Sequence, residues 1–337
     1  MKKVFLILAV MMAIIRCCGQ TAEENYKRGL SKYNAQDYNG AITEISMAIN
    51  SGLKDPEAFN KRGNAKKAIK DFTGAIADYT RAIELDPNFY KAYTNRGIAK
   101  KTLKNYMGAM ADYNKALEIN PKGQEAYYNR GIAEYEQNFL PDAIDDFSKA
   151  IELNPDYASA YLNRGNARYD LKDYAGALAD YTKAVELNPT DADSYNNRGN
   201  AKDALQDHKG AIEDFTKAIE LDPKEAGAYY NRAITKQTLK DYKGAIEDYN
   251  KVIEINSEDA DAYYNRGNAK FGLQDFLGAI EDYSKSLDIS PQSADSYYYR
   301  GLAELNIGEK ENACDDLNRA KEIGYSAANA AVIKECN

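Results

Sequence analysis

The chain has 337 residues, with 44 basic and 52 acidic side chains, one histidine and no tryptophan. This acidic balance argues against nucleic acid as a partner, because phosphate binding requires a basic face. Sites built from two imidazoles are excluded, and the sequence contains no G-x-S-x-G motif and no phosphate-binding glycine loop. We therefore nominate no catalytic residue, no metal ligand and no cofactor.

Residues 1–19 read as a leader. Two lysines precede an apolar run over residues 4–15, and small residues follow, which is the order of a secretory signal. The run is too short to cross a bilayer comfortably. We predict a signal peptide over residues 1–19 and export to the bacterial periplasm or cell envelope, or secretion. The alternative is an outer-membrane lipoprotein lipidated at Cys17 or Cys18, which is the one way in which we expect a membrane contact.

Beyond the leader, the chain repeats itself every 34 residues without insertion or deletion. Each copy carries a small residue at its eighth position and an alanine at its twentieth. A period of this length indicates a stack of helical units in which each unit touches only its neighbours. The nine copies span 22–55, 56–89, 90–123, 124–157, 158–191, 192–225, 226–259, 260–293 and 294–327.

The fifth copy shows the pattern most clearly, with Tyr161 at position 4, Gly165 at 8, Ala177 at 20 and Pro189 at 32. It closely resembles the tetratricopeptide repeat, a helix–turn–helix unit. The resemblance implies an all-α fold, namely a right-handed α-solenoid superhelix of antiparallel helix pairs. It also implies a concave groove, lined by the first helix of each pair, that binds a protein or peptide partner.

Polar residues at position 16 are expected to begin the second helix of most copies. Asp or Asn at this position can accept a hydrogen bond from the backbone at the helix start. Seven copies carry one, at Asp37, Asp71, Asn105, Asp173, Asp207, Asp241 and Asp275.

Position 7 is arginine and position 23 is acidic in every copy. If positions 8 and 20 meet in an antiparallel helix pair, positions 7 and 23 also come close, so we predict a ladder of ion pairs. The alternative is a stripe of arginines that binds an anion. The pairs would be Arg28–Glu44, Arg62–Asp78, Arg96–Asp112, Arg130–Asp146, Arg164–Asp180, Arg198–Asp214, Arg232–Asp248, Arg266–Asp282 and Arg300–Asp316.

The end of the chain, residues 328–337, is expected to form a C-terminal capping helix. Two cysteines lie outside the leader, Cys314 in the ninth copy and Cys336 in this cap. In an exported protein an even pair predicts a disulfide. The alternative is two free thiols.

The groove positions 2, 5, 9 and 12 vary between copies while the packing positions repeat, which is the best hint of function. Clusters of Tyr and Phe are typical anchors of a recognition surface. The alternatives are that these rings only pack on neighbouring copies, that the chain is a structural subunit of a cell-envelope assembly using its convex face and ends, or that the groove binds a glycan. The candidate partner-binding residues are Tyr128, Ile132, Tyr135, Leu162, Tyr169, Asn196, Asn200, Tyr230, Ile234, Tyr264, Phe271, Tyr298 and Leu302.

Overall fold

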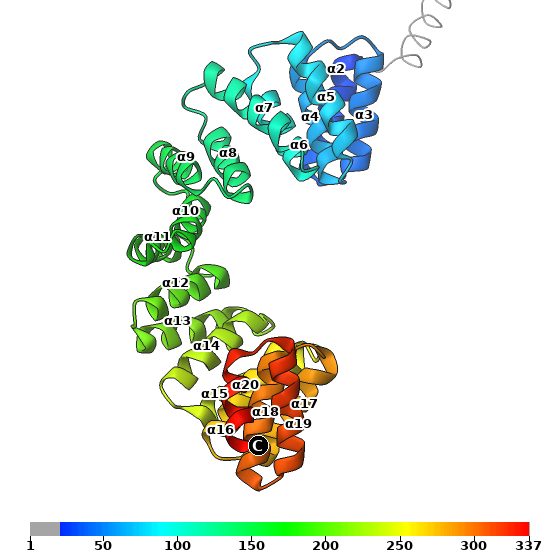
Figure 1. The fold of residues 1–337 in the computed structure, drawn as a ribbon. Coiled ribbons are helices and arrows are strands. Elements are labelled where there is room, and N and C mark those ends of the chain that lie inside the picture. Colours follow the sequence, from blue (N-terminus) through cyan, green and yellow to red (C-terminus); the bar gives the residue numbers. More distant parts are fainter. Residues whose placement is uncertain (1–20, 337) are drawn as a thin grey trace, which may run out of the picture. The chain divides into compact units, whose positions relative to one another are not determined.

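The computed structural model describes residues 21–336, which form an all-α array of helix pairs without any strand in that range (Figure 1). The predicted leader and its two cysteines lie outside the described residues. The chain divides into two compact units, Met1–Ala160 and Tyr161–Asn337, and each unit is described by itself.

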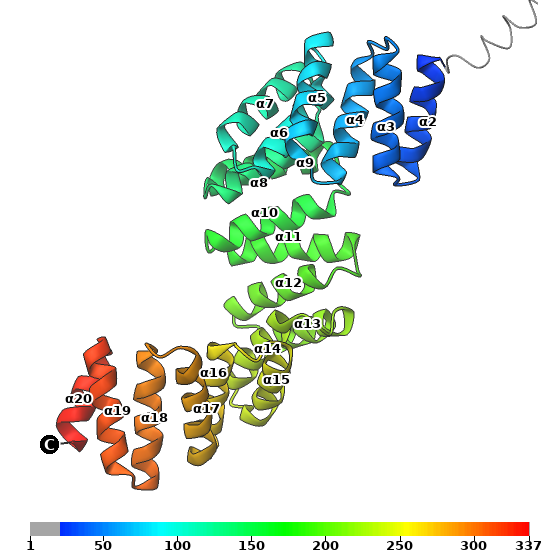
Figure 2. The same ribbon diagram turned by 90° about the vertical axis from the view of Figure 1, so that its right-hand side faces the viewer.

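The N-terminal unit consists of the four helix pairs of repeats 1 to 4 (Figure 2). Its helices are α2 (Ala22–Asn34), α3 (Tyr38–Asn50), α4 (Pro56–Ala68), α5 (Phe72–Leu85), α6 (Tyr90–Thr102), α7 (Tyr106–Ile119), α8 (Gln124–Glu136) and α9 (Leu140–Leu153).

The division between the units falls within the first helix of repeat 5, and the C-terminal unit continues through repeat 9 to a last, unpaired helix. The helices are α10 (Ala158–Asp170), α11 (Tyr174–Leu187), α12 (Ala192–Ala204), α13 (His208–Leu221), α14 (Ala226–Thr238), α15 (Tyr242–Ile255), α16 (Ala260–Gly272), α17 (Phe276–Ile289), α18 (Ala294–Ile307), α19 (Lys310–Ile323) and α20 (Ser326–Glu335).

Small residues set how closely the two helices of a repeat approach. A Cβ added to Gly165 would lie 2.6 Å from Cε1 of Tyr181, which is closer than real carbon contacts. Ala177 is fully buried beside that ring, and the two form a core cluster with Ala201 of the next repeat. The repeat therefore builds its core inside each pair and across to its neighbour.

The turn inside each repeat has one shared backbone conformation. Position 15 adopts a left-handed conformation in all nine repeats, and position 16 then caps the second helix in seven of them. The left-handed conformation is strained for residues with a Cβ. The residues that adopt it are Gln36, Lys70, Lys104, Asn138, Lys172, Gln206, Lys240, Gln274 and Gly308.

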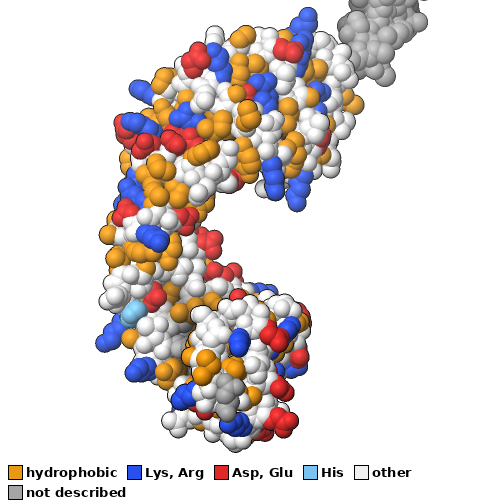
Figure 3. Space-filling model, in the orientation of Figure 1, with side chains coloured by type: hydrophobic (Ala, Val, Ile, Leu, Met, Phe, Trp, Pro, Cys, Tyr) orange, Lys and Arg blue, Asp and Glu red, His pale blue; other side chains and the backbone are white. Residues whose placement is uncertain are grey.

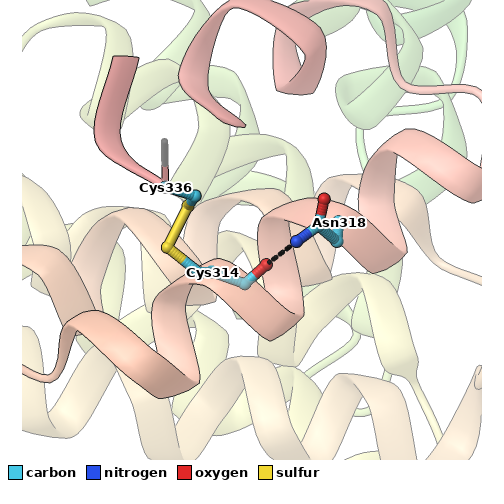
Figure 4. Close-up of a disulfide and its surroundings, with 3 residues drawn as sticks. All are labelled: Cys314, Asn318 and Cys336. Carbon is cyan, nitrogen blue, oxygen red and sulfur yellow. Dashed lines mark hydrogen bonds between the residues drawn. A yellow bond between two sulfur atoms is a disulfide. The ribbon is translucent and has the colours of Figure 1, made fainter. Parts of the chain in front are cut away.

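The last helix, α20, begins at Ser326 and packs on α19. In the structure Cys314 on α19 is joined to Cys336 at the end of α20 by a disulfide (Figure 4). The carbonyl oxygen of Cys314 also accepts a hydrogen bond of 2.8 Å from Nδ2 of Asn318. Within residues 21–336, none of the helices has the length and apolar character needed to cross a membrane.

Candidate protein-binding face

The predicted ladder of ion pairs is confirmed in all nine repeats. Arg96 is representative, because its Nη2 lies 2.7 Å from Oδ1 of Asp112 and its Nε lies 2.9 Å from Oδ2. Asp112 is only 4% exposed. A two-point bond between a guanidinium and a carboxylate is among the strongest charged pairs in proteins.

Each buried carboxylate usually has a second cation, at position 11 of the same repeat. In repeat 3, Nζ of Lys100 lies 2.7 Å from Oδ2 of Asp112 and 3.4 Å from the carbonyl oxygen of Gly108. Arg96 also lies over the ring of Tyr93, 5.5 Å from its centroid. Its Nη1 donates to Oγ1 of Thr80 in the preceding repeat. We call this set of positions 7, 11 and 23 the carboxylate network. Its arginines have partners on several sides, which favours the structural interpretation over an anion-binding stripe.

Repeats 4 and 9 carry a glutamate at position 11 instead. Glu134 is 8% exposed, and its Oε2 has no hydrogen-bond partner among residues 21–336. Burial, with the charge of Asp146 next in importance, raises the pKa of Glu134 well above its usual range. In repeat 9, burial and the neighbouring Asp316 raise the pKa of Glu304 to about 7. Both repeats also lack the side-chain cap at position 16.

The surface formed by positions 2, 5, 6, 9, 12 and 13 of the first helices, here named the first-helix face, contains the predicted binding residues. In the N-terminal unit these are Tyr128, Ile132 and Tyr135 on α8, all half-buried. Tyr128 stacks against Phe147 and Tyr157, with ring centroids 5.9 and 4.7 Å apart. Its ring is therefore only partly available to a partner.

Most predicted aromatics of the C-terminal unit also pack within the array. Leu162 and Tyr169 border the core cluster of repeat 5. The ring of Tyr264 lies 5.9 Å from that of Tyr299, and the ring of Tyr298 lies 4.7 Å from that of Tyr325, just before α20. Leu302 is half-buried.

A row of amide side chains runs between neighbouring first helices and was missed by the reading of the sequence. Asn231 donates to Oδ1 of Asn196 at 3.1 Å, and Asn265 donates to the hydroxyl of Tyr230 at 2.8 Å. The donors stand at position 6, where asparagine recurs in repeats 3 to 8. That recurrence was the available signal. Asn200 is half-buried on α12.

An open pocket of about 480 Å³ hollows the first-helix face between α14 and α16. It brings together two predicted residues, Ile234 and Phe271, and Ile234 is 39% exposed. The other lining residues are uncharged, so the pocket offers amide and hydroxyl groups beside apolar side chains. They are Gln237, Thr238, Tyr242, Tyr249, Asn265, Asn268 and Gly272.

The charge of the first-helix face differs between the two units. In repeats 1 to 4 its positions carry five lysines, at least two of which pair with glutamates, as Lys101 does with Glu136 at 2.7 Å. In repeats 6 to 9 the same positions carry four aspartates and no basic residue. On the face in view in Figure 3, hydrophobic side chains are interspersed with charged ones. The acidic residues of repeats 6 to 9 are Asp193, Asp203, Asp261 and Asp295.

The histidine, His208, has a local partner. Its Nδ1 lies 2.8 Å from Oδ1 of Asp203, which also accepts a hydrogen bond from Thr235. Among residues 21–336, no group of three or more His, Cys, Asp or Glu side chains is arranged to hold a metal ion.

Family models assign the chain to a single family. Models described as tetratricopeptide repeat or TPR repeat match most of the chain between residues 56 and 293, and the chain belongs to the tetratricopeptide repeat family. The matched segments are 56–89, 90–122, 128–192, 192–225, 215–247, 238–274 and 260–293.

Solved structures share this fold. YrrB, described as a TPR protein with an unusual peptide-binding site, is 27% identical with a TM-score of 0.50, and the match covers 55% of this chain and 95% of YrrB. A tetratricopeptide repeat protein from Parabacteroides merdae is 22% identical with a TM-score of 0.55, covering 74% of this chain and 99% of that one. PilF of Pseudomonas aeruginosa is 19% identical with a TM-score of 0.56, covering 63% and 97%. No curated protein matches the chain.

Proposed function

We propose that the protein is a non-catalytic scaffold that binds a segment of a partner protein along the first-helix face of repeats 7 and 8. The observation that carries this proposal is the open pocket between α14 and α16. Membership of the tetratricopeptide repeat family supports it, as does the likeness to YrrB, a protein with a peptide-binding site.

The chemistry of the pocket suits a polypeptide. Ile234 and Phe271 offer apolar contact for one side chain of the partner, and such anchors supply most of the affinity at interfaces. The oxygens of Asn268 and Gln237 already accept from Tyr283 and Tyr249. Their amide nitrogens offer donors for a backbone that has no secondary structure of its own. The pocket is lined by uncharged residues, so we expect a neutral side chain to enter it.

The signal-like sequence of residues 1–19 supports a second proposal, on where the protein is located. We propose that residues 1–19 are removed during export and that the mature protein works in the cell envelope or outside the cell. The mass of the protein recovered from the envelope fraction tests this. A chain that starts at Gln20 is expected, whereas a mass increased by acyl chains at Cys17 or Cys18 would establish the lipoprotein alternative.

Peptides selected from a displayed random library test the binding function. We expect the purified protein to select peptides, and Ile234→Glu to weaken their binding about tenfold or more because a carboxylate would then enter the pocket. Ile255→Glu is the matched control, since Ile255 lies at the end of α15, is 42% exposed and does not line the pocket. Equal affinity in both variants would contradict the proposed site.

A further inference from the structure

A second hollow, of about 280 Å³, lies between the N-terminal ends of α14 and α16. It stands at the other end of the same two helices from the uncharged pocket, whose lining comes mostly from their C-terminal halves. The hollow is lined by Ala226, Gly227, Tyr230, Val252, Asp259 and Asp261.

The hollow exists because position 2 of repeat 7 is glycine. The corresponding residues of the flanking repeats are Asp193 and Asp261, whose side chains project from the same place on their helices. Val252, which is only 1% exposed, and the half-buried Tyr230 leave an apolar surface inside it. A Cβ at residue 227 would meet only Oε1 of Glu225, at 3.4 Å, so the space itself is open.

Two of the residues that line the hollow carry carboxylates, Asp259 and Asp261. Asp259 caps α16 by accepting from the backbone of Ala262 at 2.9 Å through Oδ1, which leaves Oδ2 outside that bond. Asp261 is exposed and forms no ion pair with any residue in 21–336. Both stand at the N-terminus of α16, Asp259 as its N-cap and Asp261 in its first turn. Since no basic residue occupies the first-helix face of repeats 6 to 9, this charge is not neutralised there.

We infer that this hollow accepts a lysine or arginine side chain of the bound partner segment, an inference that rests on the proposed function. The aliphatic stem would lie on Val252 and Ala226, while the cationic group would reach Asp259 and Asp261. Long basic side chains combine these two properties. The ring of Tyr230 adds a face to which a cation is attracted. The partner segment would then place a basic residue in the hollow and a neutral residue in the uncharged pocket.

Substitution of the two aspartates by asparagine, which removes the charge and keeps the shape of the side chain, tests the inference. The probes are three pools of short capped peptides that share a mixed Ser, Tyr, Asn and Ala background and differ in one central residue: lysine, norleucine or glutamate. We expect the protein to prefer the lysine pool over the norleucine pool by about tenfold, and the preference to vanish in D259N/D261N. Asparagine caps a helix as well as aspartate does, so the fold is retained. The matched control is D193N/D295N, which makes the same change of net charge at position 2 of repeats 6 and 9 and should keep the preference.

The outcomes separate this inference from the proposed function. If the peptides bind without a lysine preference, or if D259N/D261N keeps that preference, the inference is overturned while groove binding stands. If none of the pools binds, the proposed function fails in this assay. A titration followed by NMR then tests separately whether the hollow binds a lysine side chain. N-acetyl-lysine methylamide should then shift the Val252 methyl signals more than N-acetyl-norleucine methylamide does, and only while both aspartates are present. An equal response to the two compounds overturns the inference.

Discussion

The carboxylate network joins the first helix of each repeat to the second, and the first-helix face lies on the same first helices, yet the two differ in how much they vary between repeats. Positions 7 and 23 hardly change between repeats, and their charges are paired at 2.5–2.7 Å. Positions 2, 5, 9 and 12 change from repeat to repeat, and some of their charges, such as that of Asp261, have no ion pair among residues 21–336. The repeated residues therefore hold the array together, while the varied ones form the surface on which the proposed recognition rests.

The carboxylate network has two forms, with a cation at position 11 in most repeats and a glutamate there in repeats 4 and 9. Removal of the carboxylate at position 23 should destabilise the two forms by different amounts. We expect Asp112→Ala to lower the free energy of unfolding by about 3 kcal/mol, because Arg96 and Lys100 would both lose their buried partner. Asp146→Ala should cost about 1 kcal/mol, because Glu134 stands 3.9 Å from Arg130 and can replace Asp146 as its partner once the carboxylate that helps to raise its pKa is gone. Urea denaturation measures both. Equal losses would show that position 11 is irrelevant to the network.

Repeat 9 lacks the basic residue at position 11 but has the disulfide and α20, whereas repeat 4 has neither. We expect Cys336→Ser to destabilise the docking of α20 by about 3 kcal/mol, given the 22-residue separation of the two cysteines. Hydrogen exchange of α20 and α19 measures the effect, and repeat 4 provides the internal control. The disulfide itself is checked by mass, which should be two protons below that of the reduced chain. Unchanged exchange in α20 would show that packing alone holds the cap.

The buried glutamates should make repeats 4 and 9 sensitive to pH. A carboxyl group whose pKa is raised in the folded state stabilises the fold below its unfolded pKa, and this contribution is lost as the pH rises through the folded value. For Glu304 the window runs from the ordinary value of 4.5 to about 7. We expect stability to fall by about 1–2 kcal/mol across that window.

Glu304→Gln should remove the dependence contributed by this site, since glutamine is neutral at every pH. Urea denaturation from pH 5 to pH 8 measures it, with Glu311→Gln as a control at an exposed position of the same repeat that does not contribute to the shift of Glu304. A slope that is identical in Glu304→Gln and the parent would contradict the assignment.

The smallest effect is expected in the turns. Repeats 4 and 9 place Asn138 and Gly308 at the left-handed position 15, residues that tolerate this conformation, while other repeats use lysine or glutamine. Lys240→Gly should raise the free energy of unfolding by about 0.5–1 kcal/mol through relief of backbone strain. Asn138→Gly should change it less. A loss of stability in Lys240→Gly would mean that the side chain, and not the backbone, decides this turn.

Contacts inside one repeat could be predicted from the sequence because helical periodicity fixes them. The Arg–acid pairs and the caps at position 16 are of this kind. The second cation at position 11 was equally readable but was overlooked. Contacts between repeats that depend on side-chain direction could not be predicted from the sequence. The bond from Asn265 to Tyr230, and the stacking of Tyr298 on Tyr325, are examples. The two hollows could not be predicted either, because such a space arises where a side chain is absent, as at Gly227.

Two residues that stand close together on α14 test the central claim, that the network is structural and the first-helix face is functional. Arg232 belongs to the network and Ile234 lines the pocket. The measurement is the free energy of unfolding and the affinity for a selected peptide, taken for Arg232→Met and for Ile234→Glu. The account predicts that Arg232→Met is less stable but binds as the parent does while folded, and that Ile234→Glu is as stable as the parent but binds weakly. A folded Arg232→Met that has lost the peptide would contradict it and would restore the arginine stripe as a binding surface.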